Sequence, residues 1–136
     1  MAYPRSANVA AYQSAVSHGG VAAADPHGLV LMLMNGALER ISKARGCITN
    51  QAFAEKAQLI HRTVQIIDQL RSSLNLQAGG SVAENLDKLY EYMCRRLLNA
   101  SVENSLAALD EVSKLLGGIR DSWAMIPKAA QSGPRK

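Results

Sequence analysis

Aromatic residues are scarce in this sequence, at 4% of the chain, although hydrophobic residues make up 48% of it. A core built from such a chain must be mainly aliphatic. Long runs of β-branched residues are also missing, and the chain uses instead the good helix formers Ala, Leu, Met, Gln, Glu and Arg. The composition therefore predicts an all-α protein, and 136 residues are enough for one domain with a substantial core.

Two further absences concern location. No apolar run approaches the ~20 residues of a membrane-spanning helix, and the first residues, "MAYPRSANVA", lack the apolar core of a signal peptide. Cys47 and Cys94 are isolated within helical patterns, which favours reduced thiols over a disulfide. We therefore expect a protein of the cytoplasm with no stable membrane insertion.

Basic residues outnumber acidic ones, giving a net charge of +4, but the excess does not form a motif for nucleic acid. Lys128, Arg135 and Lys136 lie in a tail, residues 127–136, that has no acidic residue. The other basic residues mostly alternate with Asp and Glu, as on a solvated helix surface. No DNA- or RNA-binding signature accompanies them. We expect no nucleic-acid binding, and a binder that uses the tail is the least favoured alternative.

Capping signals indicate where two long helices begin. Asp25-Pro26 predicts the start of a helix that runs to about Cys47, because Asp is a good N-cap and proline suits the first helical position. Asn50 is expected to cap a second helix, which continues to Leu76 and is ended by the "AGG" that follows.

Two more helices follow in the same way. Ser81 and Glu84 form a capping box at the start of a third helix, which is expected to reach about Ala100. Ser105 is expected to cap a fourth, and Pro127 stops it. Short connections between long helices favour antiparallel neighbours, so we predict an up-and-down four-helix bundle.

An Ala-rich segment, "SANVAAYQSAVSH", precedes these helices and carries one weak apolar stripe at Val9, Tyr12 and Val16. A helix this short is marginal in water unless it docks on a surface. We therefore divide the chain into a mobile N-terminal segment with a short lid helix (1–24), the four-helix bundle (25–126) and a basic flexible tail (127–136).

The third and fourth predicted helices each have a single apolar stripe, which we expect to face the core. The stripes are Val82, Leu86, Leu89, Tyr90, Met93, Leu97 and Ala100 in the third helix and Leu109, Val112, Leu116, Ile119, Trp123 and Ile126 in the fourth. The first two helices have wider apolar faces. Their core stripes are Val30, Leu33, Met34, Ala37, Ile41, Ala44 and Ile48 in the first and Phe53, Ala57, Ile60, Val64, Ile67 and Leu74 in the second.

Seven further apolar residues lie beside or beyond these two stripes. Leu31 and Leu38 widen the first stripe, whereas Leu29 and Met32 lie well outside it. The second stripe is extended by Leu59, Ile66 and Leu70. A central helix of a bundle can bury a wide stripe, and on that interpretation these residues are simply core. The other interpretation is a groove that another chain occupies. The pattern alone leaves both open.

Motifs for catalysis or metal binding are missing. A di-metal bundle needs Glu-x-x-His pairs, but the three histidines are scattered at positions expected to be exposed or capping: His18, His27 and His61. No nucleophile elbow or phosphate-binding loop is present. Arg95 and Arg96 could lower the pKa of Cys94, although a cysteine at the core edge is the favoured interpretation. We expect no enzyme, no metal and no cofactor.

Five segments between about residues 8 and 127 share their order and spacing with one known family. They are Ala11-Tyr12-Gln13, "DPHGLVLMLMNGAL", "IIDQLRSSLNLQAGG", "VAENLDKLYEYMCRRLLNA" and "LLGGIRDSW". On these segments the chain resembles the flagellin-specific export chaperones of bacterial flagellar systems, the FliS family. The family usually has Ser-Pro-x-Glu where Asp25-Pro26-His27-Gly28 stands, and an aromatic residue, Asp and Gly where Met34-Asn35-Gly36 stands.

The resemblance implies a non-catalytic helical bundle that holds the disordered C-terminal region of flagellin in the cytoplasm, prevents its premature polymerisation and delivers it to the export gate. The N-terminal segment is expected to cover part of the binding surface when flagellin is absent. The resemblance also permits an anti-sigma factor, a co-chaperone, export-gate components and a weak homodimer as partners. The partner-binding residues expected on this basis are Val9, Tyr12, Leu29, Leu31, Met32, Asn35, Leu38, Leu59, Ile66 and Leu70.

A second hypothesis comes from a different class of protein. The surplus apolar residues of the first two helices could mediate self-association of a structural or regulatory helical bundle with no export client. A stable dimer that buries these stripes and binds no flagellin would favour it.

Overall fold

The computed structural model of the chain describes residues 25–126, without the side chains of residues 76–78. This part of the chain contains four α-helices and no strand, which confirms the all-α class. The predicted lid helix with Val9 and Tyr12, and the predicted flexible tail, lie outside the described residues.

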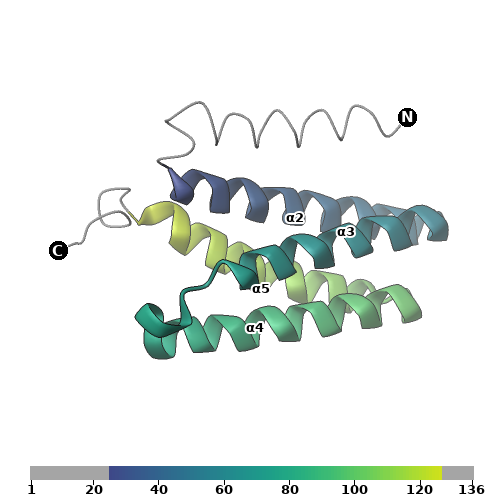
Figure 1. Ribbon diagram of the computed structural model, residues 1–136. Helices are drawn as coiled ribbons and strands as arrows, with labels where there is room; N and C mark the ends of the chain where they lie inside the picture. The colour runs from purple at the N-terminus through teal and green to yellow at the C-terminus, as the bar shows by residue number, and fades with distance from the viewer. Residues whose placement is uncertain (1–24, 127–136) are drawn as a thin grey trace.

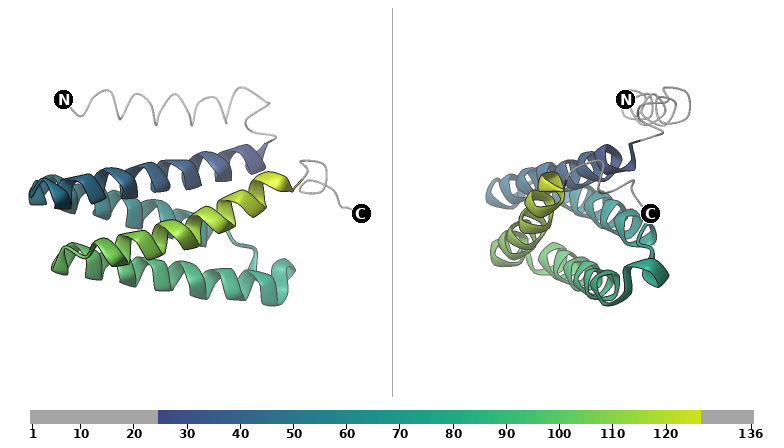
Figure 2. Two further views of the ribbon diagram at one scale, coloured as in Figure 1. Left: turned by 180° about the vertical axis from the view of Figure 1, so that it is seen from behind. Right: turned by 90° about the vertical axis from the view of Figure 1, so that its left-hand side faces the viewer.

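Helices α2 (Pro26–Thr49), α3 (Phe53–Ser72), α4 (Leu76–Glu103) and α5 (Leu106–Met125) lie alongside one another (Figure 1). Each helix runs back along the one before it, and the end-on view in Figure 2 shows the four arranged around a common centre. Helix α2 packs against α3 and α5, and α4 packs against the same two helices. Helices α2 and α4 are therefore diagonal partners, and each has one side that no described helix covers.

The start of α2 is as predicted. Oδ1 of Asp25 accepts a hydrogen bond from the amide of Gly28 at 3.0 Å, and Pro26 occupies the first helical position. Because the first amides of a helix have no partner within it, this carboxylate satisfies one of them. Helix α2 then extends to Thr49, two residues beyond Cys47.

The prediction that Asn50 caps the second helix is wrong, because Asn50 instead ends α2. Gln51 has a φ of 62°. Its amide donates to the carbonyl of Ile48 at 3.1 Å, and the amide of Ala52 donates to the carbonyl of Cys47 at 2.8 Å. This pair of hydrogen bonds is a Schellman motif, which satisfies the last carbonyls of a helix. Helix α3 begins directly afterwards with no side-chain cap.

The boundary between the second and third helices also differs from the prediction. Helix α3 ends at Ser72 rather than at Leu76, which is the first residue of α4. Gly80 then interrupts α4 with a φ of 57° and a ψ of −133°. A positive φ suits glycine and strains other residues. The glycine pair therefore marks a kink inside α4, and the long straight part of that helix begins at Ser81.

The turn between α4 and α5 contains the predicted cap. Oγ of Ser105 accepts a hydrogen bond from the amide of Ala108 at 3.0 Å, so the cap at the start of α5 is confirmed. Asn104, with a φ of 53°, reverses the chain, and the amide of Ser105 donates to the carbonyl of Ala100 at 3.1 Å. Helix α5 ends at Met125, two residues before the proline predicted to stop it.

A lysine reinforces the end of α4. Lys56 of α3 is only 6% exposed, and its Nζ donates to the carbonyl of Ser101 at 2.6 Å and to Oδ1 of Asn104 at 2.7 Å. The same Nζ lies 5.4 Å from the centre of the Phe53 ring. A cation at a helix C-terminus bonds free carbonyls and lies at the negative end of the helix dipole. No local sequence pattern predicts this contact between residues 45 positions apart.

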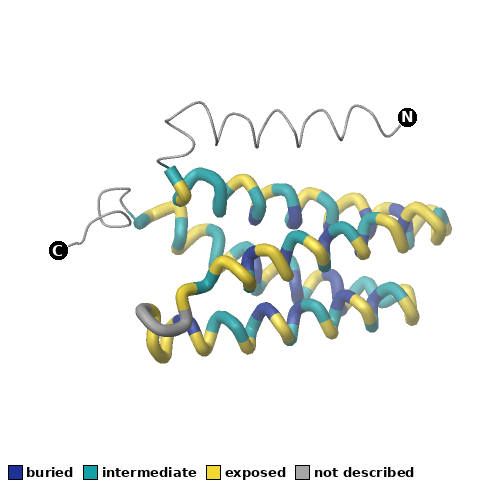
Figure 3. The backbone as a smooth tube through the Cα atoms, viewed as in Figure 1, coloured by how far each residue is buried: buried dark blue, intermediate teal, exposed yellow. Residues whose placement is uncertain are grey.

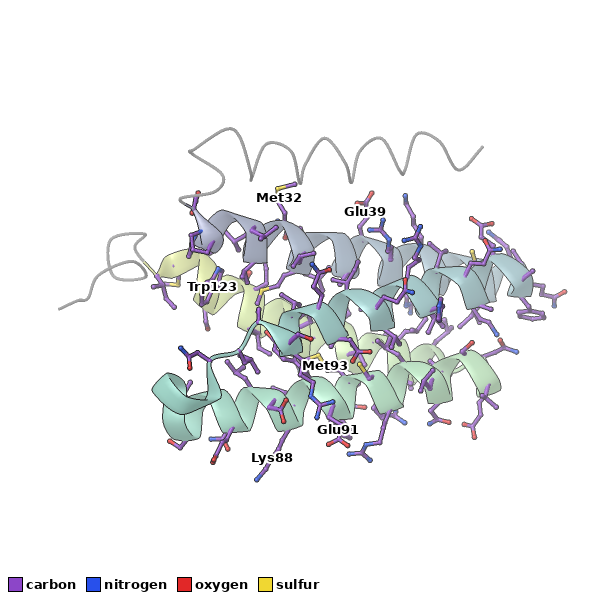
Figure 4. All side chains as sticks on the ribbon, viewed as in Figure 1. Met32, Glu39, Lys88, Glu91, Met93 and Trp123 are labelled. Carbon is purple, nitrogen blue, oxygen red and sulfur yellow. The ribbon has the colours of Figure 1, made fainter. Side chains whose placement is uncertain are left out.

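The core lies between the four helices, and Figure 3 shows buried positions on every one of them. It consists of Met34, Ala37, Ile41, Ala44, Ile60, Ile67, Leu70, Tyr90, Met93, Leu97, Ala100, Ala108, Leu109, Val112 and Leu116. All of these except Tyr90 are non-aromatic, as the composition predicts. Met93, labelled in Figure 4, points from α4 toward the other helices.

Three residues predicted to be core are exposed. Phe53, 43% exposed, lies in the first turn of α3, and Lys56 takes the inward position one turn later. Ala57 follows Lys56 and is turned away from the core by 100° on the helix. Val82, 67% exposed, comes directly after the break at Gly80. At these positions the buried side of the helix is taken by the neighbouring residues Lys56 and Ala83.

Candidate partner-binding surface

The apolar run at the start of α2 lies at the surface. No residue from 26 to 33 is fully buried, and Met32 is 53% exposed. Its side chain points away from the other three helices in Figure 4. Leu29 and Leu31 beside it are partly buried, and the first residue that enters the core is Met34. The start of α2 therefore has apolar area that the described part of the chain leaves open.

Three of the other predicted partner-binding residues continue this surface toward α3. Leu38 on α2 and Leu59 and Ile66 on α3 are partly buried and pack against the edge of the core. Ile66 reaches α2 beside Gly36, where an added Cβ would lie 3.9 Å from its Cδ1. Nη1 of Arg40 donates to the carbonyl of Gly36 at 3.0 Å and adds a polar group at this border, which sequence reasoning did not identify.

Leu70 does not belong to the surface. It is 2% exposed and lies in the core, one helical turn beyond the fully buried Ile67, so the prediction that it lines an open groove is wrong. The opposite holds for Val30 and Leu33. Both were predicted to be core, but they are only partly buried and pack against the core from outside. The open apolar area therefore lies more on α2 and less on α3 than the sequence suggested.

The side of α2 that faces α5 carries polar contacts. Asn35, a predicted partner-binding residue, is exposed, and its Oδ1 accepts a hydrogen bond from Nε of Arg120 at 2.8 Å. The ring of His27 stacks on Trp123 with centroids 5.1 Å apart. Nε2 of His27 donates to the carbonyl of Trp123 at 2.7 Å, and Nε1 of Trp123 donates to the carbonyl of His27 at 3.0 Å.

These contacts correct the expectation that His27 is exposed or capping. It is partly buried, and Figure 4 shows Trp123 at the end of α5 that lies beside the start of α2. The two residues are 96 positions apart, so no local pattern connects them. The one signal for this contact in the sequence was the presence of a single tryptophan, Trp123.

The thiol of Cys94 is not activated, in contrast to the alternative that Arg95 and Arg96 lower its pKa. Burial, and next the Asp68 carboxylate 3.7 Å from Sγ, raise the pKa of Cys94 to about 12. Arg71 is the arginine whose charge opposes this rise in pKa, and neither Arg95 nor Arg96 contributes to it. Arg96 instead bonds Glu111 at 2.7 Å. Both cysteines are free thiols, as predicted, and Cys94 packs at the core edge.

Among residues 25–126, no group of three or more His, Cys, Asp and Glu side chains is placed to hold a metal ion. None of the four described helices combines the length and apolar character that crossing a membrane requires.

The fold and this surface define an all-helical protein with apolar area open on two neighbouring helices, an arrangement that helical proteins use to bind other polypeptides. The family model described as flagellar protein FliS matches residues 7–130. The chain therefore belongs to the FliS family.

Relatives from three organisms cover most of this chain. The flagellar secretion chaperone FliSB of Pseudomonas aeruginosa is 43% identical over 82% of this chain and 89% of its own length. The flagellar secretion chaperone FliS of Salmonella typhimurium is 36% identical over 90% and 92%. The protein of the same name from Vibrio cholerae is 33% identical over 86% of each chain.

Proposed function

We propose that this protein is a flagellar secretion chaperone that binds the disordered C-terminal region of flagellin in the bacterial cytoplasm. It prevents premature polymerisation of flagellin and delivers it to the flagellar type III export apparatus. The names of the relatives from Pseudomonas aeruginosa and Salmonella typhimurium, which match over most of their lengths, support this proposal.

The observation that carries the proposal is the open apolar surface at the start of α2. A disordered chain loses conformational entropy when it binds, so coupled folding and binding typically buries ~1,000–3,000 Å². Met32 is half exposed, and Leu29, Leu31, Leu38 and Ile66 are incompletely covered. The flexible thioether of methionine adapts to different neighbours, which suits a surface that binds an unstructured client.

The proposal includes the arrangement of the helices and of the N-terminal segment around this surface. The four helices form an antiparallel up-and-down bundle, and residues 1–24 act as a lid that places Val9 and Tyr12 on the surface when flagellin is absent. The protein works by binding alone and has no catalytic step.

A substitution on α2 with a matched control on α4 tests the function. Met32→Asp places a charge in the client contact and lowers the affinity for the flagellin C-terminal region about tenfold or more. Leu98→Asp changes a residue of the same 53% exposure on α4 and leaves the affinity unchanged. Fluorescence anisotropy of a labelled flagellin fragment measures both, and circular dichroism checks that both variants remain helical.

The client region is tested separately. Cytosolic flagellin that lacks its C-terminal region is not captured on the immobilised protein, whereas full-length flagellin is. Equal capture of full-length and truncated flagellin would contradict the proposed binding of the C-terminal region.

Self-association remains the second candidate because of three exposed apolar side chains at the other end of the bundle. Leu98 and Val102 lie one turn apart on α4, and Phe53 begins α3. Light scattering over a range of concentrations separates the two functions. A stable dimer that does not bind the flagellin fragment supports self-association.

A further inference from the structure

The start of α2 and the end of α5 contribute little to the core. The buried residues of α5 are Ala108, Leu109, Val112 and Leu116, all before residue 117. The buried residues of α2 all come after Leu33. Between these limits, the start of α2 and the last two turns of α5 contact each other without a fully buried side chain from either helix. Hydrophobic burial therefore stabilises the contact between these two segments less than it stabilises the rest of α2 and α5.

Polar and ring contacts join these two segments instead. The stacked pair of His27 and Trp123 is joined by its two hydrogen bonds, and Arg120 bonds Asn35 two turns further along α2. Residues 27, 31 and 35 are spaced by four, so Leu31 lies on the same face of α2 between the two contacts. The end of α5 thus lies along a face of α2 that carries Leu31 and Asn35.

Two glycines separate this segment from the rest of α5. Gly117 and Gly118 follow the last buried residue, Leu116. A Cβ added to either glycine would have no atom within 4 Å, so close packing does not require glycine at these positions. Glycine in a helix interior gives the backbone more freedom than any other residue. The helix is therefore weakest directly before the segment that the polar contacts hold.

We propose that residues 119–125 of α5 form a displaceable arm that bends at Gly117-Gly118 and competes with the client for α2. In the closed state, the arm covers the face of Leu31 and Asn35. The client reaches this face by displacing the arm, so its apparent affinity includes the free energy of opening. The inference rests on the proposed function, because it describes how access to the same surface is regulated.

Two variants shift the arm in opposite directions. Arg120→Ala removes the bond to Asn35, favours the open arm and strengthens client binding about threefold or more. The double change Gly117→Ala and Gly118→Ala favours the continuous helix and the closed arm, and weakens client binding by a similar factor. A fixed contact with no regulatory role predicts no opposite shifts.

Matched controls exclude general effects of these changes. Asp121→Ala removes the neighbouring contact of Arg120, which joins Nη1 to Oδ1 at 3.1 Å, without touching the bond to α2. Gly46→Ala replaces a glycine of α2 that likewise has open space around it and lies far from the arm. Both controls bind the client as the unchanged protein does.

Trp123 reports the arm directly because it is the chain's one tryptophan. In the full-length protein without client, acrylamide quenching of its fluorescence is stronger for Arg120→Ala and weaker for the double alanine variant. A saturating, tryptophan-free flagellin C-terminal fragment increases the quenching by about twofold or more, because the client opens the arm.

The outcomes separate the two proposals. If the fragment binds but the quenching and the affinities are the same in all variants, the arm is a fixed contact and the inference fails while the proposed function stands. If the fragment does not bind at all, the proposed function fails. The client-free quenching series then still decides whether the arm opens.

Discussion

Lys56 is a charged residue at a position that helical periodicity assigns to the core. Its long aliphatic stem is buried, and its Nζ replaces hydration with the Ser101 carbonyl, the Asn104 amide oxygen and the Phe53 ring. The contact joins the start of α3 to the end of α4 over 45 residues. Lys56, a charged residue within an apolar stripe, therefore connects the start of α3 to the end of α4.

Replacing this lysine tests its structural role. Lys56→Met keeps most of the buried stem but leaves the Ser101 carbonyl without its cation, and we expect the free energy of unfolding to fall by about 1–3 kcal/mol. Lys43→Met is the control, because Lys43 is exposed and has only the pair with Glu39 at 3.5 Å. Its effect stays within about 0.5 kcal/mol. Urea unfolding measures both, and equal effects would contradict the capping role.

Cys94 provides a prediction about reactivity. Because its pKa is raised to about 12, mainly by burial, very little thiolate is present at pH 8. Alkylation by iodoacetamide in a Cys47→Ala background is therefore expected to be roughly a thousandfold slower than for an unperturbed thiol, whose pKa is near 8.5. The rate rises about tenfold per pH unit between pH 8 and 10. A rate that levels off near pH 9 would contradict the raised pKa.

At the scale of helices, local chemistry predicted two of the four helix starts. Asp25 and Ser105 cap their helices as expected, since each bonds an amide three residues away. Asn50 failed because Gln51 adopts a positive φ, a conformation for which the sequence offered no glycine as a signal. The end of α3 was missed because apolar spacing continues through the turn to Leu74. Helical periodicity identifies the residues that share one face of a helix, but it does not show where the chain turns.

The kink within α4 is tested with two glycine substitutions. Gly80→Ala forces a Cβ into a φ of 57°, and we expect a loss of about 1–3 kcal/mol in the free energy of unfolding. Gly46→Ala, in a helical conformation with open space, is neutral or stabilising by up to about 1 kcal/mol. Thermal unfolding followed by circular dichroism compares them. A Gly80→Ala protein as stable as the Gly46→Ala protein would mean that the kink is not required.

At the scale of the whole molecule, the net charge lies outside the helical domain. Arg5, Lys128, Arg135 and Lys136 equal the full +4, and residues 25–126 contain as many acidic as basic side chains. The composition thus predicted the fold class. Helical periodicity identified surplus apolar residues on the first helix but left open whether they are core or an open surface. The sequence did not predict which apolar residues are covered, because Leu70 and Leu31 are the same residue type and differ in how far their surroundings bury them.

The charge distribution leads to a prediction about nucleic acid. Deleting residues 127–136 lowers the net charge from +4 to +1 by removing three basic residues. We expect flagellin capture to be unchanged, and neither form to show salt-dependent binding to DNA or RNA in filter-binding assays. Binding by the full chain that weakens steeply with salt and disappears with the tail would reverse this assignment.

The packing of α2 against α5 affects the order in which contacts form during synthesis and folding. Helix α2 packs on α3 and α3 on α4 as neighbours in sequence, whereas His27 meets Trp123 only across 96 residues. Contacts that close long loops form later than local ones. During synthesis, α2 is therefore complete before the segment that lies against it exists. A newly made molecule presents the apolar start of α2 to its surroundings earlier, and more fully, than a finished one does.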